Sequence, residues 1–149
     1  QMCIRDRATT GPLVFEGKEY LDYTSKYLKG TPSAIYVGAL SSNGTVSSPA
    51  KLASYSSYPG ADTVVQKQSL VVGVDASKNG GLEGTSFAAP IIAGYSAILG
   101  SKFVNATATQ VANQLLNTAR KDTISGYDVT LHGQGEASLT RALAPSRIR

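Results

Sequence analysis

Two short apolar runs constrain the fold of this chain most strongly. They are 34–40 (AIYVGAL) and 70–75 (LVVGVD), and turn residues bound each of them. An uninterrupted apolar run of this length is typical of a strand that is buried on both faces, as in a parallel sheet. A longer apolar stretch, 86–102, predicts a helix that is buried nearly all round. This order of elements predicts a layered α/β fold.

Three further segments have helical signatures. Thr107 and Gln110 match a capping box, and apolar residues recur at helical spacing through residue 119. The segment 137–144 predicts a last short helix that Pro145 ends. The spacing of tyrosines and leucines in 16–29 predicts an early helix.

Composition excludes several classes of protein. The chain has 149 residues, of which 42% are hydrophobic and 16% charged, so most of it should fold rather than remain disordered. The length by itself predicts one domain. A single cysteine, Cys3, excludes an internal disulfide framework and zinc sites built from paired cysteines.

The charge and hydropathy patterns predict neither a nucleic-acid partner nor a membrane span. The net charge is +4, but the first ten residues contribute +1 and the last five contribute +2, which leaves no basic stripe between them. The most apolar stretch, 87–103, is interrupted by residues such as Pro90, Gly94 and Lys102. A bilayer span needs about 20 mostly apolar residues, so a buried helix explains this stretch better.

The two ends of the chain differ from its middle. The opening residues, QMCIRDR, have no periodicity and lead into no recognisable element. We therefore expect 1–10 to be a non-native or disordered segment, 11–145 to form the folded unit, and 146–149 to be a tail.

Ser86 is the strongest candidate for a catalytic residue. It lies where a loop becomes the apolar helix, in the motif GTSFAAP. At such a position the free backbone amides of the first helical turn can receive an oxyanion, and the helix dipole favours that charge. Serine is also a common helix N-cap, and spacing alone favours that simpler role.

Two other properties of the motif are unusual for a plain helix start. Pro90 removes an amide from the first or second turn and should distort the beginning of the helix. The small residues Gly84, Ala88 and Ala89 would let a substrate backbone approach closely.

The stretch from Gly84 to Gly94 resembles the nucleophile motif of the subtilisin-like serine proteases, the subtilases. Other segments resemble the same family in the same order: 35–40, 53–57 with Pro59 and Gly60, 107–119 and 133–142. The resemblance implies an α/β fold of the subtilisin type, with a mostly parallel sheet and flanking helices.

For chemistry, the resemblance implies hydrolysis of peptide bonds through an acyl-enzyme. Ser86 takes the part of the nucleophile, its amide belongs to the oxyanion hole, and Thr85 is expected to support that hole. Subtilases supply an aspartate and a histidine upstream of the serine, but this chain has no histidine before Ser86. We therefore expect a C-terminal fragment of a catalytic domain, inactive by itself, whose partner is the missing N-terminal half.

The family also implies protein or peptide substrates and a bacterial enzyme that is secreted or held at the cell surface or in the periplasm. Subtilases often bind calcium, but no loop of alternating aspartates occurs here. We therefore expect these residues to hold neither a metal nor a cofactor.

Two alternatives remain open. The first is a binding module that keeps the subtilase scaffold without catalysis. The second is an esterase of the α/β-hydrolase type, since Ser86, Asp128 and His132 follow that family's chain order. Ala88 stands where the hydrolase motif has its last glycine, which weighs against the second alternative.

Overall fold

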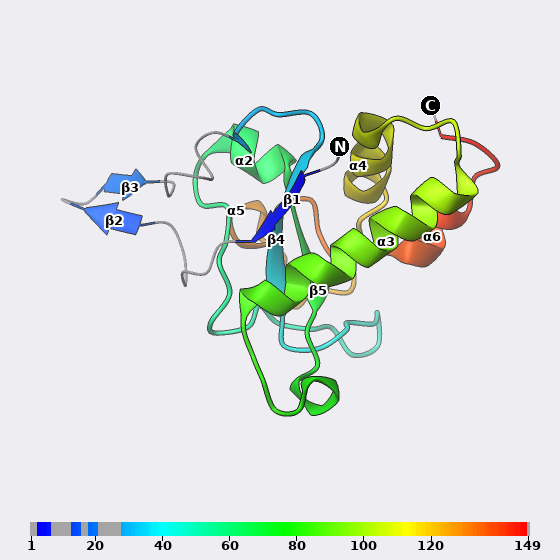
Figure 1. Cartoon of the computed structure of the whole chain (residues 1–149). Helices are drawn as coiled ribbons and strands as arrows, with labels where there is room; N and C mark the ends of the chain where they lie inside the picture. Colours follow the sequence, from blue (N-terminus) through cyan, green and yellow to red (C-terminus); the bar gives the residue numbers. More distant parts are fainter. Residues whose placement is uncertain (1–2, 7–12, 16–17, 21–27, 149) are drawn as a thin grey trace.

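A three-stranded parallel sheet lies at the centre of the computed structural model, which describes residues 3–6, 13–15, 18–20 and 28–148. The strand order is β1, β4, β5 (Figure 1). The strands of both sheets are β1 Cys3–Asp6, β2 Leu13–Phe15, β3 Lys18–Tyr20, β4 Ala34–Leu40 and β5 Ser69–Gly73. The helices are α2 Thr63–Lys67, η1 Ala76–Asn79, η2 Thr85–Phe87, α3 Ala88–Lys102, α4 Ala108–Asn117, α5 Val129–His132 and α6 Leu139–Leu143.

The two apolar runs form the strands that their composition predicts. β4 and β5 pair in parallel, with Val37 opposite Leu70, and every residue of β5 is buried. Residues of both strands alternate between two helical layers, as the period of two along a strand requires. The predicted fold class is confirmed.

One face of the sheet carries the main core. Ile35, Val37 and Ala39 of β4 pack there with Leu70 and Val72 of β5 against α3, α4 and α6. The other face is covered by α2 and α5, with α2 also contacting α5 (Figure 1). Since α2 lies in the connection from β4 to β5, it covers this second face as the chain crosses over.

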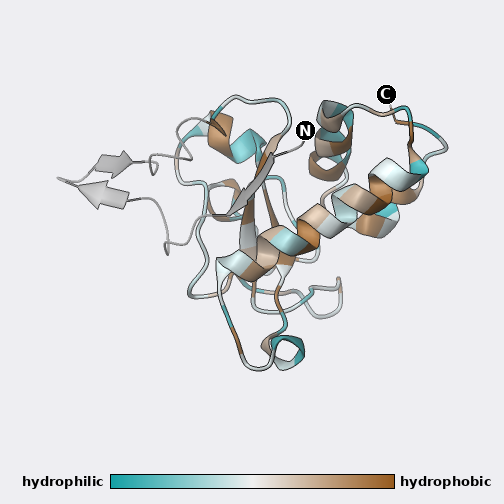
Figure 2. Cartoon of the chain, in the orientation of Figure 1, coloured by the Kyte–Doolittle hydropathy of each residue, from teal (hydrophilic) through white to brown (hydrophobic). Residues whose placement is uncertain are grey.

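The long apolar helix differs from its prediction. α3 begins after a 3-10 turn, η2, which agrees with the irregular start expected from Pro90. Its buried residues form one stripe, namely Ala88, Ile92, Ser96 and Leu99. The opposite side is open to solvent, and Ile98 on it is 45% exposed. Hydrophobic residues recur along the length of α3 (Figure 2). The prediction of burial nearly all round is therefore wrong for this chain.

α4 has the predicted capping box. The Thr107 hydroxyl accepts from the Gln110 amide at 3.2 Å, and the Gln110 side chain accepts from the Thr107 amide at 2.8 Å. The buried face comprises Val111, Ala112, Leu115 and Leu116. The last predicted helix is present as α6, which is shorter than 137–144.

Three local predictions need correction or lie outside the described residues. Of the helix predicted over 16–29, residues 16–17 and 21–27 are not among those described, and Lys18–Tyr20 is strand β3. No element was predicted near the N-terminus, whereas Cys3–Asp6 pairs in parallel with β4. The unpredicted helix α2 is capped by Asp62, whose carboxylate accepts from the amides of Val64 and Val65. The unit 11–145 and the tail 146–149 stay predictions.

Candidate active site

Ser86 lies exposed in the middle of η2, at the end of the loop that follows β5. The N-cap of η2 is Gly84 and that of α3 is Phe87, and neither helix start has a side-chain capping bond. The simpler reading of Ser86 as an N-cap is therefore wrong. A serine that does not cap its helix leaves its hydroxyl available for another purpose.

The polar groups of Ser86 are free within the described part of the chain. Neither its hydroxyl nor its backbone amide makes a hydrogen bond there. The amide belongs to the first turn of a helix, where unsatisfied N–H groups and the positive end of the helix dipole meet. An oxygen that gains negative charge next to Ser86 would find a donor in place.

Thr85 is buried directly before Ser86, at 3% exposure. Its Oγ1 accepts a long hydrogen bond, 3.4 Å, from the backbone amide of Ser57. With one lone pair occupied by this amide, the hydroxyl proton of Thr85 remains as a donor. Its predicted part in an oxyanion hole is compatible with this arrangement and stays a prediction.

The residues around Ser86 have different structural tasks. Gly84 has φ +150° and ψ 150°, a backbone conformation that residues other than glycine rarely adopt. Pro90 is the third residue of α3, where its missing amide would have no helical partner in the first turn. Ala88 is fully buried in the core and does not face the surface. The expectation that Ala88 makes room for a substrate is therefore wrong.

His132 lies in a different environment. It is 2% exposed, and its Nδ1 lies 3.0 Å from both the amide nitrogen and the carbonyl oxygen of Asp128. The Asp128 carboxylate instead accepts from the amide and hydroxyl of Thr130. Burial lowers the pKa of His132 below its ordinary value, although the neighbouring Asp128 acts in the opposite direction. The imidazole is thus a structural group that ties the two ends of α5 together.

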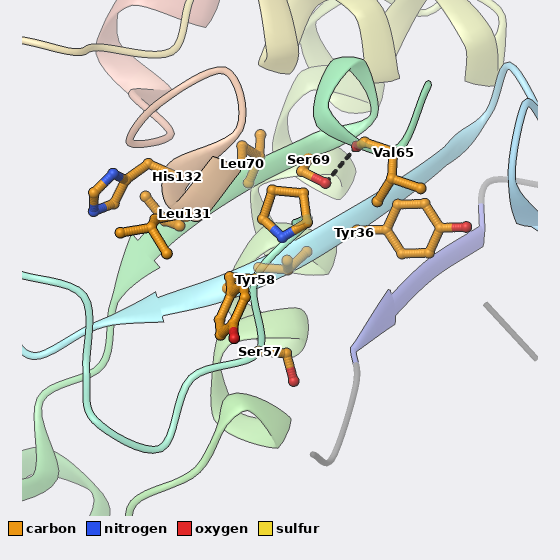
Figure 3. A pocket seen from close by; sticks show the side chains of 12 residues that line it. Tyr36, Ser57, Tyr58, Val65, Ser69, Leu70, Leu131 and His132 are labelled. Atoms are coloured by element: carbon orange, nitrogen blue, oxygen red, sulfur yellow. Dashed lines mark hydrogen bonds between the residues drawn. The ribbon is translucent and has the colours of Figure 1, made fainter. Parts of the chain in front are cut away.

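The sheet separates His132 from the Ser86 helix. His132 lines a small cavity, of about 20 Å³, together with Tyr36, Gly38 and Ser69 (Figure 3). These strand residues alternate with those that pack against α3, so the cavity belongs to the opposite face of the sheet. The structure does not bring Ser86, Asp128 and His132 together, which contradicts the hydrolase alternative.

Two properties hold for the described residues alone. No group of three or more histidine, cysteine, aspartate or glutamate side chains gathers there in a way that could hold a metal ion. No helix among these residues is long and apolar enough to cross a membrane.

The model of the subtilase family, Peptidase_S8, matches residues 15–137. The chain belongs to the subtilase family. This is a family of serine proteases, and the sequence motif around Ser86 lies within the matched range. No curated protein matches the chain.

Solved structures share the fold of this subtilase chain. PagA, a prenylagaramide maturation protease, has 21% identity and a TM-score of 0.61 over 95% of this chain and 49% of its own. Fervidolysin from Fervidobacterium pennivorans, a keratinolytic enzyme related to subtilisin, has 24% identity and a TM-score of 0.60 over 97% of this chain and 22% of its own. A mutant of the protease domain of PatA has 24% identity and a TM-score of 0.54, over 74% and 39% respectively. The chain thus spans about half the length of PagA and less of the other two.

Sequence reasoning missed the contacts that hold the turn before Ser86. The segment 53–57 was recognised only as part of the family pattern, yet Ser57 bonds to Thr85 across 28 residues. The serines of this segment were a weak signal, because hydroxyls in an otherwise apolar loop need hydrogen-bond partners when they are buried. Which partners they find depends on the tertiary structure.

Proposed function

We propose that this chain is the serine-bearing part of a subtilase catalytic domain and that Ser86 is the nucleophile of an endopeptidase. The observation that carries this proposal is the state of Ser86: it is exposed just before helix α3, it caps nothing, and its hydroxyl and amide are free in the described part of the chain. A serine with only a structural role would be expected to bond within the turn.

In the proposed reaction, Oγ of Ser86 attacks the carbonyl carbon of a peptide bond. A histidine accepts the Oγ proton and returns it to the departing amine, and an aspartate orients that histidine. The tetrahedral oxyanion receives hydrogen bonds from the Ser86 amide and from Thr85. Water then cleaves the acyl ester by the same steps, which restores the free Ser86 hydroxyl.

The histidine and aspartate must come from a polypeptide segment outside these residues, because His132 is committed to Asp128. We infer that this segment is the N-terminal half of the same domain. The open face of α3 supports the inference: its apolar side chains Ala97 and Ile98 are exposed, and such a face is usually covered. Ser86 directly precedes Phe87, the N-cap of the same helix.

Substrates and location follow from family membership as proposals. Peptides or proteins are the expected substrates, and the complete enzyme would act outside the bacterial cytoplasm, secreted or at the cell surface or in the periplasm. The isolated chain is expected to hydrolyse no peptide, since it lacks a base that can reach Ser86.

The test is covalent labelling with a fluorophosphonate probe. We expect the chain joined to an upstream half that supplies aspartate and histidine to be labelled at Ser86 and to cleave peptides. Ser86→Ala in the same protein should abolish both, whereas His132→Ala should retain labelling once a folded sample is confirmed.

Two results would count against the proposal. A completed, folded domain that is not labelled would favour the alternative of a binding module on a subtilase scaffold. Labelling that depends on the His132 imidazole would instead support the α/β-hydrolase alternative.

A further inference from the structure

The segment Tyr55–Ser57 links β4 to the turn that carries Ser86. Ser56 is its buried centre, at 2% exposure. Its Oγ accepts from the backbone amide of Ala39 in β4 at 2.8 Å and donates to the carbonyl of Ser57 at 2.8 Å. A single hydroxyl thus joins the strand to the segment and also sets the local conformation of the segment.

The same segment contacts the two residues that precede Ser86. The Ser57 amide donates to Oγ1 of Thr85. The Tyr55 ring packs against the main core, and the Gly84 backbone is among the groups that influence its hydroxyl. Burial, together with the charge of Glu83, raises the pKa of Tyr55, so the phenol remains neutral and keeps its geometry at ordinary pH.

The sheet is shaped to admit this segment. A Cβ at Gly38 would lie 3.0 Å from the Ser57 carbonyl oxygen and 3.2 Å from Oγ of Ser56. Both approaches are closer than ordinary packing allows. The glycine in β4 therefore lets the segment lie directly against the strand.

The turn itself has little to hold it. Gly84 is the N-cap of η2 and Phe87 is the N-cap of α3, and neither makes a side-chain capping bond. A turn that must present donors to an oxyanion has to be held to within a fraction of an ångström, because the donors act at 2.7–3.1 Å in general. Contacts from outside the turn are the available means.

We propose that Ser56 is a positioning residue of the Ser86 site, and that Tyr55–Ser57 act as a brace that fixes the η2 turn to β4. This inference rests on the proposed role of Ser86 as nucleophile. Through the brace, the rigid sheet fixes the positions of Gly84 and Thr85. The positions of the Ser86 amide and hydroxyl are fixed in turn. The Ser57 amide also donates to one lone pair of the Thr85 hydroxyl oxygen. This bond restricts the directions in which the Thr85 hydroxyl proton can point.

The test compares two buried serines in the full chain. Ser56→Ala removes the hydroxyl that bonds to Ala39 and Ser57, whereas Ser96→Ala removes a buried hydroxyl of α3 whose one bond among the described residues is to the Ile92 carbonyl of its own helix. Amide hydrogen exchange is measured residue by residue, with global stability taken from urea unfolding. We expect exchange at the hydrogen-bonded amides of Ser57 and Phe87 to be roughly tenfold faster in Ser56→Ala than in Ser96→Ala at equal global stability.

Tyr55→Phe provides a second arm, in case Ser56→Ala does not fold. It keeps the ring in the core and removes only the hydroxyl, which lies close to the Gly84 backbone. Exchange at the Phe87 amide, which closes the turn on Gly84, should rise while the melting temperature changes little. Unchanged exchange at the turn in both variants, or an equal effect of Ser96→Ala, would overturn the brace.

These measurements need no catalysis, so they separate the two proposals. In the completed domain, Ser56→Ala should lower kcat about tenfold with little change in KM, since it disturbs the transition-state donors rather than substrate binding. Ser96→Ala should leave kcat unchanged. Faster exchange at the turn without any activity in the unmodified completed domain would support the brace and reject the nucleophile.

Discussion

Ser86 reaches the surface because its neighbours are held in unusual states. Gly84 has a backbone conformation that favours glycine, and Thr85 is buried beneath the turn. The sequence motif identifies these residues, but the structural role of each one follows from backbone angles and burial. At this scale the site is a short turn whose conformation depends on a glycine, rather than a set of reactive side chains.

Replacing Gly84 by alanine should strain this turn. The nearest atom to an added Cβ is 3.8 Å away, so the cost arises from the backbone and not from a clash, at about 1–3 kcal/mol. Urea unfolding should show that loss, and labelling of Ser86 in the completed domain should slow. Gly100→Ala is the control, since its Cβ meets open space in α3, and it should be neutral or stabilise by about 0.5–1 kcal/mol. Equal stability of the two variants would contradict strain at Gly84.

Glu136 should make stability depend on pH. It is 8% exposed, and its carboxylate accepts from the Gly44 amide and the Thr123 hydroxyl. Burial raises its pKa above the ordinary value, even though these two bonds and Arg120 act to lower it. The folded protein then binds a proton at higher pH than the unfolded chain does. Its contribution to stability must therefore fall as pH rises through the raised pKa.

Glu136→Gln isolates this effect, because glutamine does not titrate. The free energy of unfolding of the unmodified chain, minus that of the variant, should decrease from acidic to neutral pH in urea titrations. A difference that is constant or increases with pH would mean that the bonds from Gly44 and Thr123 outweigh the cost of burial.

At the scale of elements, α4 is the helix whose sequence and structure agree most fully. Thr107→Ala breaks its capping box and leaves the Gln110 amide without a partner. We expect a loss of about 0.5–2 kcal/mol in urea unfolding. Thr107→Ser retains the hydroxyl and should restore most of the stability. A null effect of Thr107→Ala would show that solvent satisfies this amide equally well.

α3 shows the limit of reading elements from sequence. Its composition is apolar on all sides, and this predicted both its helical state and full burial. Only the side with Ile92 and Leu99 is buried in this chain. Hydropathy indicates whether a helix surface is more stable when it is buried. Whether that surface is buried depends on which segments are present to cover it.

At the scale of the whole molecule, the open side of α3 should promote self-association. Ile98→Lys places a charge on this face and should shift the isolated chain toward monomer in size-exclusion chromatography with light scattering. Val104→Lys, at an exposed apolar residue beyond the end of α3, is the control and should have less effect.

The same substitution should have the opposite effect on the completed domain. There the N-terminal half would cover Ile98, so a buried lysine should destabilise the domain and weaken the assembly of its halves. An Ile98→Lys domain as stable as the unmodified one would contradict docking on this face of α3.

The hydrolase alternative failed at this same scale. Ser86, Asp128 and His132 have a plausible order along the chain, but order does not determine which face of the sheet a residue reaches. His132 lines the cavity on the face opposite α3, and its ring nitrogen is bonded to the Asp128 backbone. The order of residues along the chain can suggest a catalytic triad, but only the packing of the layers can bring its three residues into contact.

The sequence by itself determined the presence of strands β4 and β5, the capped helix that follows Thr107, and the family motif around Ser86. These are local properties, since apolar runs, capping hydroxyls and a tight motif act over a few residues. The tertiary structure decided that Ser86 is not a cap, that Ser56 and Ser57 reach the turn, and that one side of α3 is open. Those facts depend on contacts between residues far apart in the chain, and such contacts leave no fixed spacing in the sequence.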